Sequence, residues 1–72
     1  MLLHFIQQLP QKQRLVVHLR DIEAYEVAEI ARTLDMDEGT VRVNLMRARH
    51  KLKVQLQKIF DYEKRQMERY KG

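Results

Sequence analysis

The sequence predicts an all-α protein, a small domain of four helices that contains a helix-turn-helix and has a long C-terminal helix. Its 72 residues include only two glycines and one proline, whereas the helix-favouring residues Leu, Gln, Lys, Arg and Glu are abundant. Apolar residues also recur three and four positions apart along most of the chain, which is the spacing of a buried helical face. A chain this short forms one domain with a small core.

Two helices are expected before residues 21–26, the segment that connects them to the rest of the chain. Residues 1–9 form a short amphipathic helix, in which Leu2, Phe5, Ile6 and Leu9 lie on one stripe. A second helix runs from Pro10 to about Arg20, because proline suits the first turn of a helix, where its missing N–H leaves no hydrogen bond unmade. Residues 21–26 then lead into the next helix.

A helix-turn-helix is predicted from residue 27 onwards. One helix covers residues 27–34, another begins at Glu38, and only three residues separate them. Asp35 tolerates the left-handed conformation that ends a helix, and Asp37 can cap the next helix by accepting a hydrogen bond from the N–H of Gly39 or Thr40. Such a corner brings two helices close together, and the small Ala31 fits that approach.

The last helix is expected to continue to the end of the chain, because no glycine or proline interrupts it after Gly39 until Gly72. Apolar residues recur as far as Phe60, and charged residues dominate beyond it. We therefore divide the chain into a domain at residues 1–60 and a charged helical tail at residues 61–72. The tail is expected to be a solvated end, and docking on a partner or a second copy is the alternative.

The helix that begins at Glu38 has a basic outer face. Its apolar side carries Val41, Leu45, Ala48 and Leu52, and the opposite side is rich in arginine, as a major-groove reader requires. Arginines here could read guanine, apolar side chains could meet thymine methyl groups, and the remaining cations could contact phosphates. An ordinary solvated charged face is the alternative for each residue. The candidate DNA-binding residues are Thr40, Arg42, Val43, Met46, Arg47, Arg49 and His50, with Lys12 and Arg14 from the second helix.

Three runs within these helices resemble region 4 of bacterial RNA polymerase sigma factors, most closely the extracytoplasmic-function (ECF) group. The runs are Glu29-Ile30-Ala31, then Asp37-Glu38-Gly39-Thr40-Val41-Arg42, then Leu45-Met46-Arg47-Ala48-Arg49. Upstream, Leu9 to Arg14 matches the family pattern L-P-x-x-Q-R. The chain departs from the usual residues at four positions: Ala24 replaces glycine, Glu26 a Ser or Thr cap, Val43 a serine and Asn44 an arginine.

The resemblance implies a function in transcription initiation. Region 4 recognises the −35 promoter element while it is bound to the flap of the polymerase β subunit, and an anti-sigma factor can mask these surfaces. The apolar side chains of Leu3, Phe5 and Val17 could supply the flap-binding surface, although a plain core is the stronger reading for them. Since ECF sigma factors carry a region 2 ahead of region 4, we expect the chain to be a fragment that begins at region 4. We expect it to be cytoplasmic, because the sequence shows neither a membrane-spanning apolar run nor the pattern of a signal peptide.

Other classes of function lack support in the sequence. There is no cysteine, no glycine-rich phosphate loop and no catalytic triad, and the three histidines share no metal-ligand spacing. We therefore expect no enzyme activity, no cofactor, no metal and no membrane segment. The net charge of +4 favours a polyanionic partner, but weakly. Two alternatives stay open: a helix-turn-helix regulator unrelated to polymerase, and a helical interaction or dimerisation module.

Overall fold

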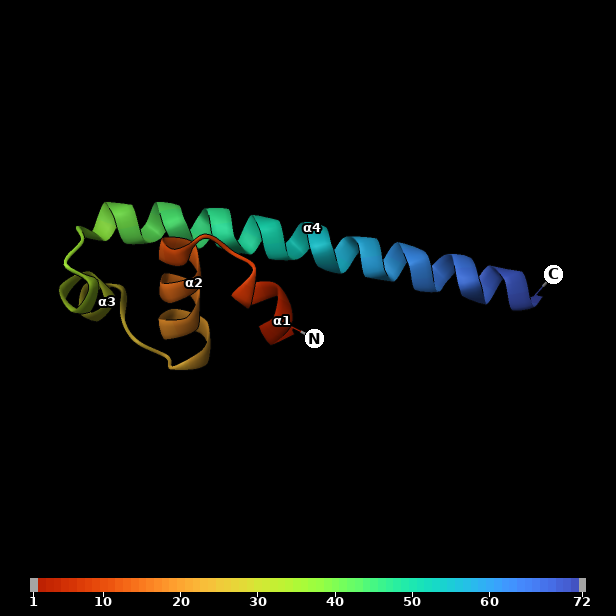
Figure 1. Cartoon of the computed structure of the whole chain (residues 1–72), viewed down its shortest axis with the longest axis horizontal. Helices are drawn as coiled ribbons and strands as arrows, with labels where there is room; N and C mark the ends of the chain where they lie inside the picture. Colours follow the sequence, from red (N-terminus) through yellow and green to blue (C-terminus); the bar gives the residue numbers. More distant parts are fainter. Residues whose placement is uncertain (1, 72) are drawn as a thin grey trace.

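The computed structural model describes residues 2–71, with the side chains of residues 3–69, and this part of the chain is all-α (Figure 1). The helices are α1 (Leu2–Gln7), α2 (Gln11–Val17), α3 (Val27–Leu34) and α4 (Glu38–Lys71), with a π-helical turn, η1 (His18–Ile22), between α2 and α3. The predicted fold class, four helices with a long last one, is confirmed.

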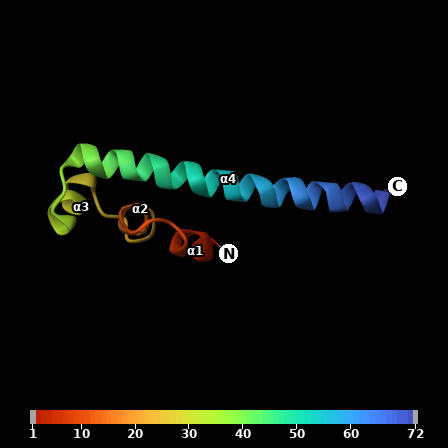
Figure 2. The same ribbon diagram turned by 45° about the horizontal axis from the view of Figure 1, so that its top comes forward.

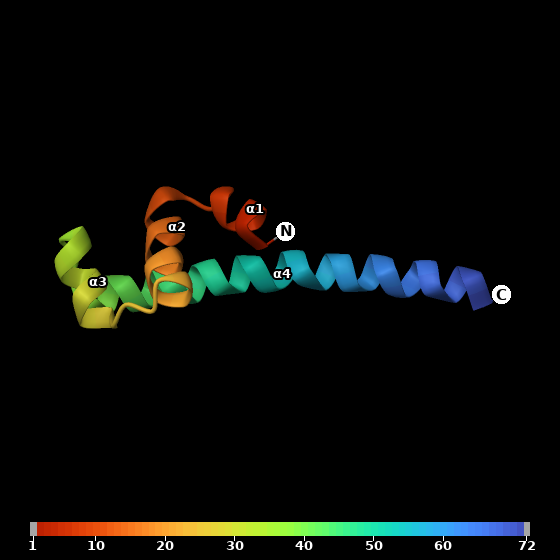
Figure 3. The ribbon, with the colours of Figure 1, turned by 90° about the horizontal axis from the view of Figure 1, so that it is seen from below.

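Helix α4 is a rod that runs the length of the molecule, which measures 55 × 18 × 17 Å. The other three helices lie on one side of its first half, with α3 nearest its start, α2 crossing it and α1 furthest along (Figures 1 and 3). The second half of α4 projects beyond them (Figure 2). The fold therefore consists of a compact helical head and a projecting rod.

The core lies between α4 and the three shorter helices. The centre of the core is formed by α2, α3 and α4, which contribute the almost completely buried side chains of Val16 and Val17, Ile30, and Val41 respectively. Leu52 is the last buried residue among the side chains of α4 that the structure describes, and Phe60 is already 61% exposed. The apolar contacts that stabilise the head therefore end about halfway along the rod. Among the side chains that the structure describes, the buried apolar residues are Ile6, Leu9, Val16, Val17, Ile30, Ala31, Val41, Leu45, Ala48 and Leu52.

The first two helices are shorter than the sequence predicts. Helix α1 ends at Gln7, and Leu9 follows in a turn whose N–H donates to the carbonyl of Ile6 at 3.1 Å. Pro10 precedes α2 instead of lying in its first turn, because it has extended backbone angles while its carbonyl accepts the first helical hydrogen bond, from Arg14. Val17 is only 1% exposed, so the stronger expectation for this residue, a place in the core, is confirmed, and it offers no surface to a polymerase flap.

The predicted continuation of α2 to Arg20 is replaced by η1, in which the helix widens to π-type hydrogen bonds. Ala24 follows with a φ of 61°, in the left-handed region. This residue reverses the chain, so that the N–H of Tyr25 donates to the carbonyl of Leu19 at 2.8 Å. The Arg20 guanidinium donates to the carbonyl of Tyr25 at 2.8 Å and fixes the connector from the other side.

The corner of the helix-turn-helix forms as predicted. Asp35 is left-handed, with φ 53° and ψ 52°, and the N–H of Met36 donates to the carbonyl of Ala31 at 2.9 Å. Asp37 caps α4 by accepting a hydrogen bond from the N–H of Thr40 at 2.7 Å, and the hydrogen bonds from Thr40 lower the pKa of the Asp37 carboxyl. This corner fixes the direction in which α4 leaves α3.

Candidate nucleic-acid interface

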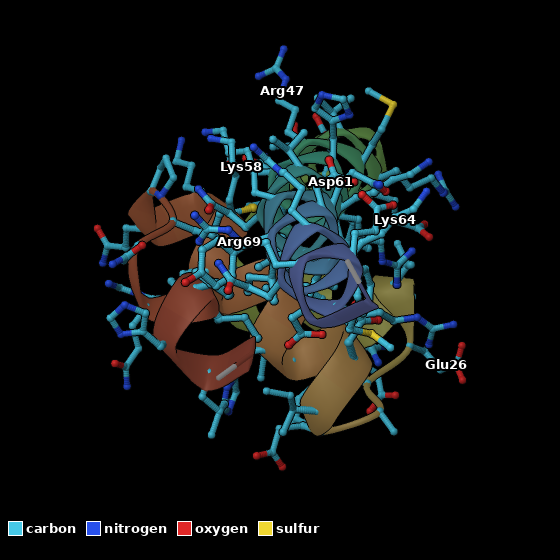
Figure 4. The ribbon with its side chains drawn as sticks, turned by 90° about the vertical axis from the view of Figure 1, so that its right-hand side faces the viewer. Glu26, Arg47, Lys58, Asp61, Lys64 and Arg69 are labelled. Carbon is cyan, nitrogen blue, oxygen red and sulfur yellow. The ribbon has the colours of Figure 1, made fainter. Side chains whose placement is uncertain are left out.

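The outer face of α4 consists of Arg42, Val43, Met46, Arg47 and His50, and all five side chains are exposed. Burial of the opposite side of the helix in the core produces this arrangement. Figure 4, seen along α4, shows Arg47 pointing away from the other helices. Met46 is 65% exposed and Val43 is 40% exposed, so the face combines cationic and apolar groups.

A hollow lies on the side of this face nearest α2, and we call it the α2-side hollow. Gln13 of α2 lines it together with Met46, Arg47, His50 and Lys51 of α4. The residues that line it carry cationic or neutral groups and no carboxylate. Phosphate could therefore approach this hollow without meeting a negative charge from its walls.

A second hollow, the α3-side hollow, lies where η1, α3 and α4 meet. Its cationic residues are Arg20 of η1 and Arg42 and Arg49 of α4, and Met46 reaches it as well. Met46 therefore lies between two cationic hollows, one on each flank of the outer face. A helix that inserts into a major groove has a phosphate backbone on each side, and this arrangement provides cations for both.

The arginines of the α3-side hollow already have carboxylate partners within the chain. Arg49 makes a fork with Asp21 of η1, in which Nε donates to Oδ2 at 3.1 Å and Nη2 to Oδ1 at 2.5 Å. The hydrogen bonds that Arg49 donates to Asp21 raise the pKa of the Arg49 guanidinium. Arg42 lies 3.4 Å from Glu38 on the same helix. The α3-side hollow is thus more nearly neutral than the α2-side hollow.

Comparison with known proteins decides the family. Residues 1–52 match the family described as Sigma-70, region 4. The chain belongs to the sigma-70 region 4 family. The match ends at Leu52, beyond which no described side chain of α4 is buried. No curated protein and no solved structure matched the chain.

Region 4 is a DNA-binding, regulatory part of sigma factors and not a catalytic family. In the described range, residues 2–71, no group of three or more His, Cys, Asp or Glu could hold a metal ion. Within the same range, no helix is both long enough and apolar enough to cross a membrane.

Backbone groups in the first turn of α4 of this region 4 domain already form hydrogen bonds within the chain. The N–H of Thr40 donates to Asp37, and its carbonyl accepts a hydrogen bond from the side-chain amide of Asn44 at 2.9 Å. A Cβ added to Gly39 would meet Asp37 Oδ1 at 3.6 Å, an ordinary contact. The free domain therefore has room for a side chain at position 39. Asn44, where the family usually has arginine, turns its amide inward to its own helix.

The two candidate residues of α2 lie apart from the outer face. Lys12 is exposed and Arg14 is half-buried, and neither lines the two hollows. Gln13 between them does reach the α2-side hollow, so the start of α2 lies beside the outer face. Sequence reasoning missed Gln13, Arg20 and Asp21, because their positions depend on how α2 and η1 pack against α4 and no local pattern indicates it.

Proposed function

We propose that this chain recognises the −35 promoter element as region 4 of an ECF-type sigma factor and so directs RNA polymerase to promoters. The outer face of α4 would enter the major groove, with the two hollows facing the phosphate backbones. Family membership supports this proposal, and the exposed cationic outer face carries it. The motif that ends in Arg47-Ala48-Arg49 supports the ECF assignment.

The outer face contains groups for two kinds of base contact. Arg42 and Arg47 would donate to guanine O6 and N7, and a good pair of such bonds is worth about 1–3 kcal/mol against a wrong base. Val43 and Met46 would contact thymine methyl groups. Because Val43 replaces the serine common in the family and Asn44 is turned inward, the preferred sequence would differ from that of better-known members.

Phosphate contacts would supply much of the affinity. Thr40 and Gly39 lie at the first turn of α4, where the backbone can approach a phosphate, and His50 lies on the outer face. Lys12 and Arg14, which line neither hollow, would contact phosphate beside the start of α2. Arg49 is tied to Asp21 and would contribute less than an unpaired arginine. With about five phosphate contacts, affinity would fall about 10²–10³-fold between 50 and 200 mM salt.

Polymerase would complete the complex in the cytoplasm. Leu3 is 58% exposed and Phe5 is half-buried on α1, so they supply apolar surface for the β flap. An anti-sigma factor could cover the same surface or the outer face of α4. Binding of a purified β-flap fragment would separate a sigma factor from a helix-turn-helix regulator that acts without polymerase.

The experiment uses Arg47→Ala and duplexes selected from a random library by the wild-type protein. We expect the variant to bind the selected duplex about 5–150-fold more weakly, from the loss of a guanine contact. Arg69→Ala, which removes an exposed arginine from the charged tail, is the matched control and should leave affinity nearly unchanged. Circular dichroism would check that both variants keep their helicity. Full binding by Arg47→Ala would overturn the proposal and favour a helical interaction module.

A further inference from the structure

Gln13 is a buried polar residue whose hydrogen bonds are incomplete. This residue is only 9% exposed, and it lies at the start of α2, the helix that also contributes Val16 and Val17 to the core. No donor from the described side chains or backbone lies within hydrogen-bonding distance of its Oε1. A buried carbonyl oxygen without a donor destabilises the folded state, and an apolar side chain of similar size would avoid this cost.

The α2-side hollow, which Gln13 lines, contains three donor side chains: Arg47, His50 and Lys51. Arg47 points away from the other helices (Figure 4). Lys51 follows Arg47 by four residues, so the two share one flank of α4, whereas His50 lies nearer the middle of the outer face. Lys51 is therefore the donor best placed to turn towards Gln13. Its ammonium group has three N–H donors, enough for one bond to Gln13 and others to a phosphate.

We propose that Gln13 is a positioning residue for a DNA phosphate contact, and that its Oε1 accepts a hydrogen bond from the Lys51 ammonium group in the DNA complex. This inference rests on the proposed function, because it requires the outer face of α4 to lie against a duplex. In the free protein Lys51 is exposed. A bound duplex covers the hollow and excludes water, which strengthens the bond and fixes the ammonium group at the phosphate.

On this proposal, Oε1 of Gln13 lacks a donor in the free protein and gains one, the Lys51 ammonium group, when DNA binds. A residue that served only the core would gain nothing from an amide at this position. A residue that positions Lys51 needs an acceptor that is rigid and close to α4, and burial in α2 provides both. Stability and DNA binding should therefore respond in opposite directions when the amide is removed.

The test measures unfolding and DNA binding of Gln13→Met, which keeps the length of the side chain and removes the acceptor. We expect a higher unfolding midpoint, a roughly 3–10-fold loss of affinity, and a salt slope smaller by up to about one unit. Lys51→Ala should lower the slope similarly, and the double variant should lose little more than Lys51→Ala alone. Gln7→Met, at an exposed position of α1, is the control for the substitution and should change neither property.

Three outcomes would overturn the assignment. Unchanged affinity and slope in Gln13→Met would show that the amide has no function in DNA binding. Fully additive losses in the double variant would show that Gln13 does not act through Lys51. If Gln13→Met fails to fold, NMR of the wild-type protein decides, because an unshifted Gln13 side-chain amide on binding to the selected duplex would contradict the proposal. If wild type binds no duplex, the proposed function itself fails.

Discussion

Ala24 offers a direct test of the connector that positions the helix-turn-helix, through the substitution Ala24→Gly. Ala24 has a φ of 61°, and its left-handed conformation allows the hydrogen bond from Tyr25 to Leu19. An L-residue with a Cβ is strained in this region, whereas glycine is not. The side chain of Ala24 is exposed, so glycine would remove no core contact.

The magnitude follows from two opposing terms. Relief of the left-handed conformation is worth about 1–2 kcal/mol for a residue with a Cβ. Glycine also increases the conformational entropy of the unfolded chain, which costs about 0.4–1 kcal/mol. The net effect is a gain of about 0.5–1 kcal/mol in the free energy of unfolding. For a domain of this size, that gain raises the melting temperature by about 2–8 °C.

Thermal and denaturant unfolding followed by circular dichroism would measure this change. Ala28→Gly is the matched control, because Ala28 is also exposed but lies in α3, where glycine should lower stability by about 0.5–1 kcal/mol. The two substitutions should thus have opposite signs. A lower melting temperature for Ala24→Gly, similar to that of the control, would refute the left-handed conformation and the connector described here.

Four further substitutions or deletions have defined outcomes. The pKa of the Asp37 carboxyl is lowered in the folded state, so its contribution to stability is present above its unfolded pKa and is lost as pH falls through the lower folded value. Asp37→Asn keeps a capping side chain that does not titrate, so it should flatten the dependence of stability on pH below about pH 4 in acid unfolding. Asp21→Asn frees Arg49, so we expect stability to fall by no more than about 1 kcal/mol while DNA affinity and salt slope rise. Gly39→Ala should stabilise the free domain, which has room for the methyl group, and weaken DNA binding if a phosphate approaches there. Deletion of residues 61–72 should change unfolding free energy by about 0.5 kcal/mol or less and leave DNA affinity intact.

Local patterns in the sequence were sufficient to predict the helix-turn-helix. The corner depends on residues whose own chemistry sets the backbone, namely the left-handed Asp35 and the capping Asp37, so it could be read without tertiary information. The buried side of α4 followed from apolar spacing. The outer face could be predicted from the buried side, because residues on the opposite side of a helix from its core contacts are exposed.

The end of α2 could not be predicted, because no local signal distinguishes α-helical from π-helical turns at His18–Ile22. Helical spacing continues through this segment. Its contacts, from Asp21 to Arg49 and from Arg20 to the carbonyl of Tyr25, join residues that only the folded chain brings together. Ala24, where the family usually has glycine, was noted only as a departure from the family pattern, and its left-handed conformation was not predicted. The hollows beside the outer face likewise depend on packing between helices, so their residues from α2 and η1 were not foreseen.

The most direct test of DNA recognition by α4 is an NMR titration of the protein with a duplex selected by binding. If the outer face of α4 lies in the major groove, backbone amide shifts should concentrate on the first half of α4, around Arg42, Met46 and His50, and at the start of α2. Little change is expected in the charged tail at residues 61–72. Shifts confined to the tail or to α1, with the outer face of α4 unaffected at saturation, would contradict the central claim that this face reads DNA.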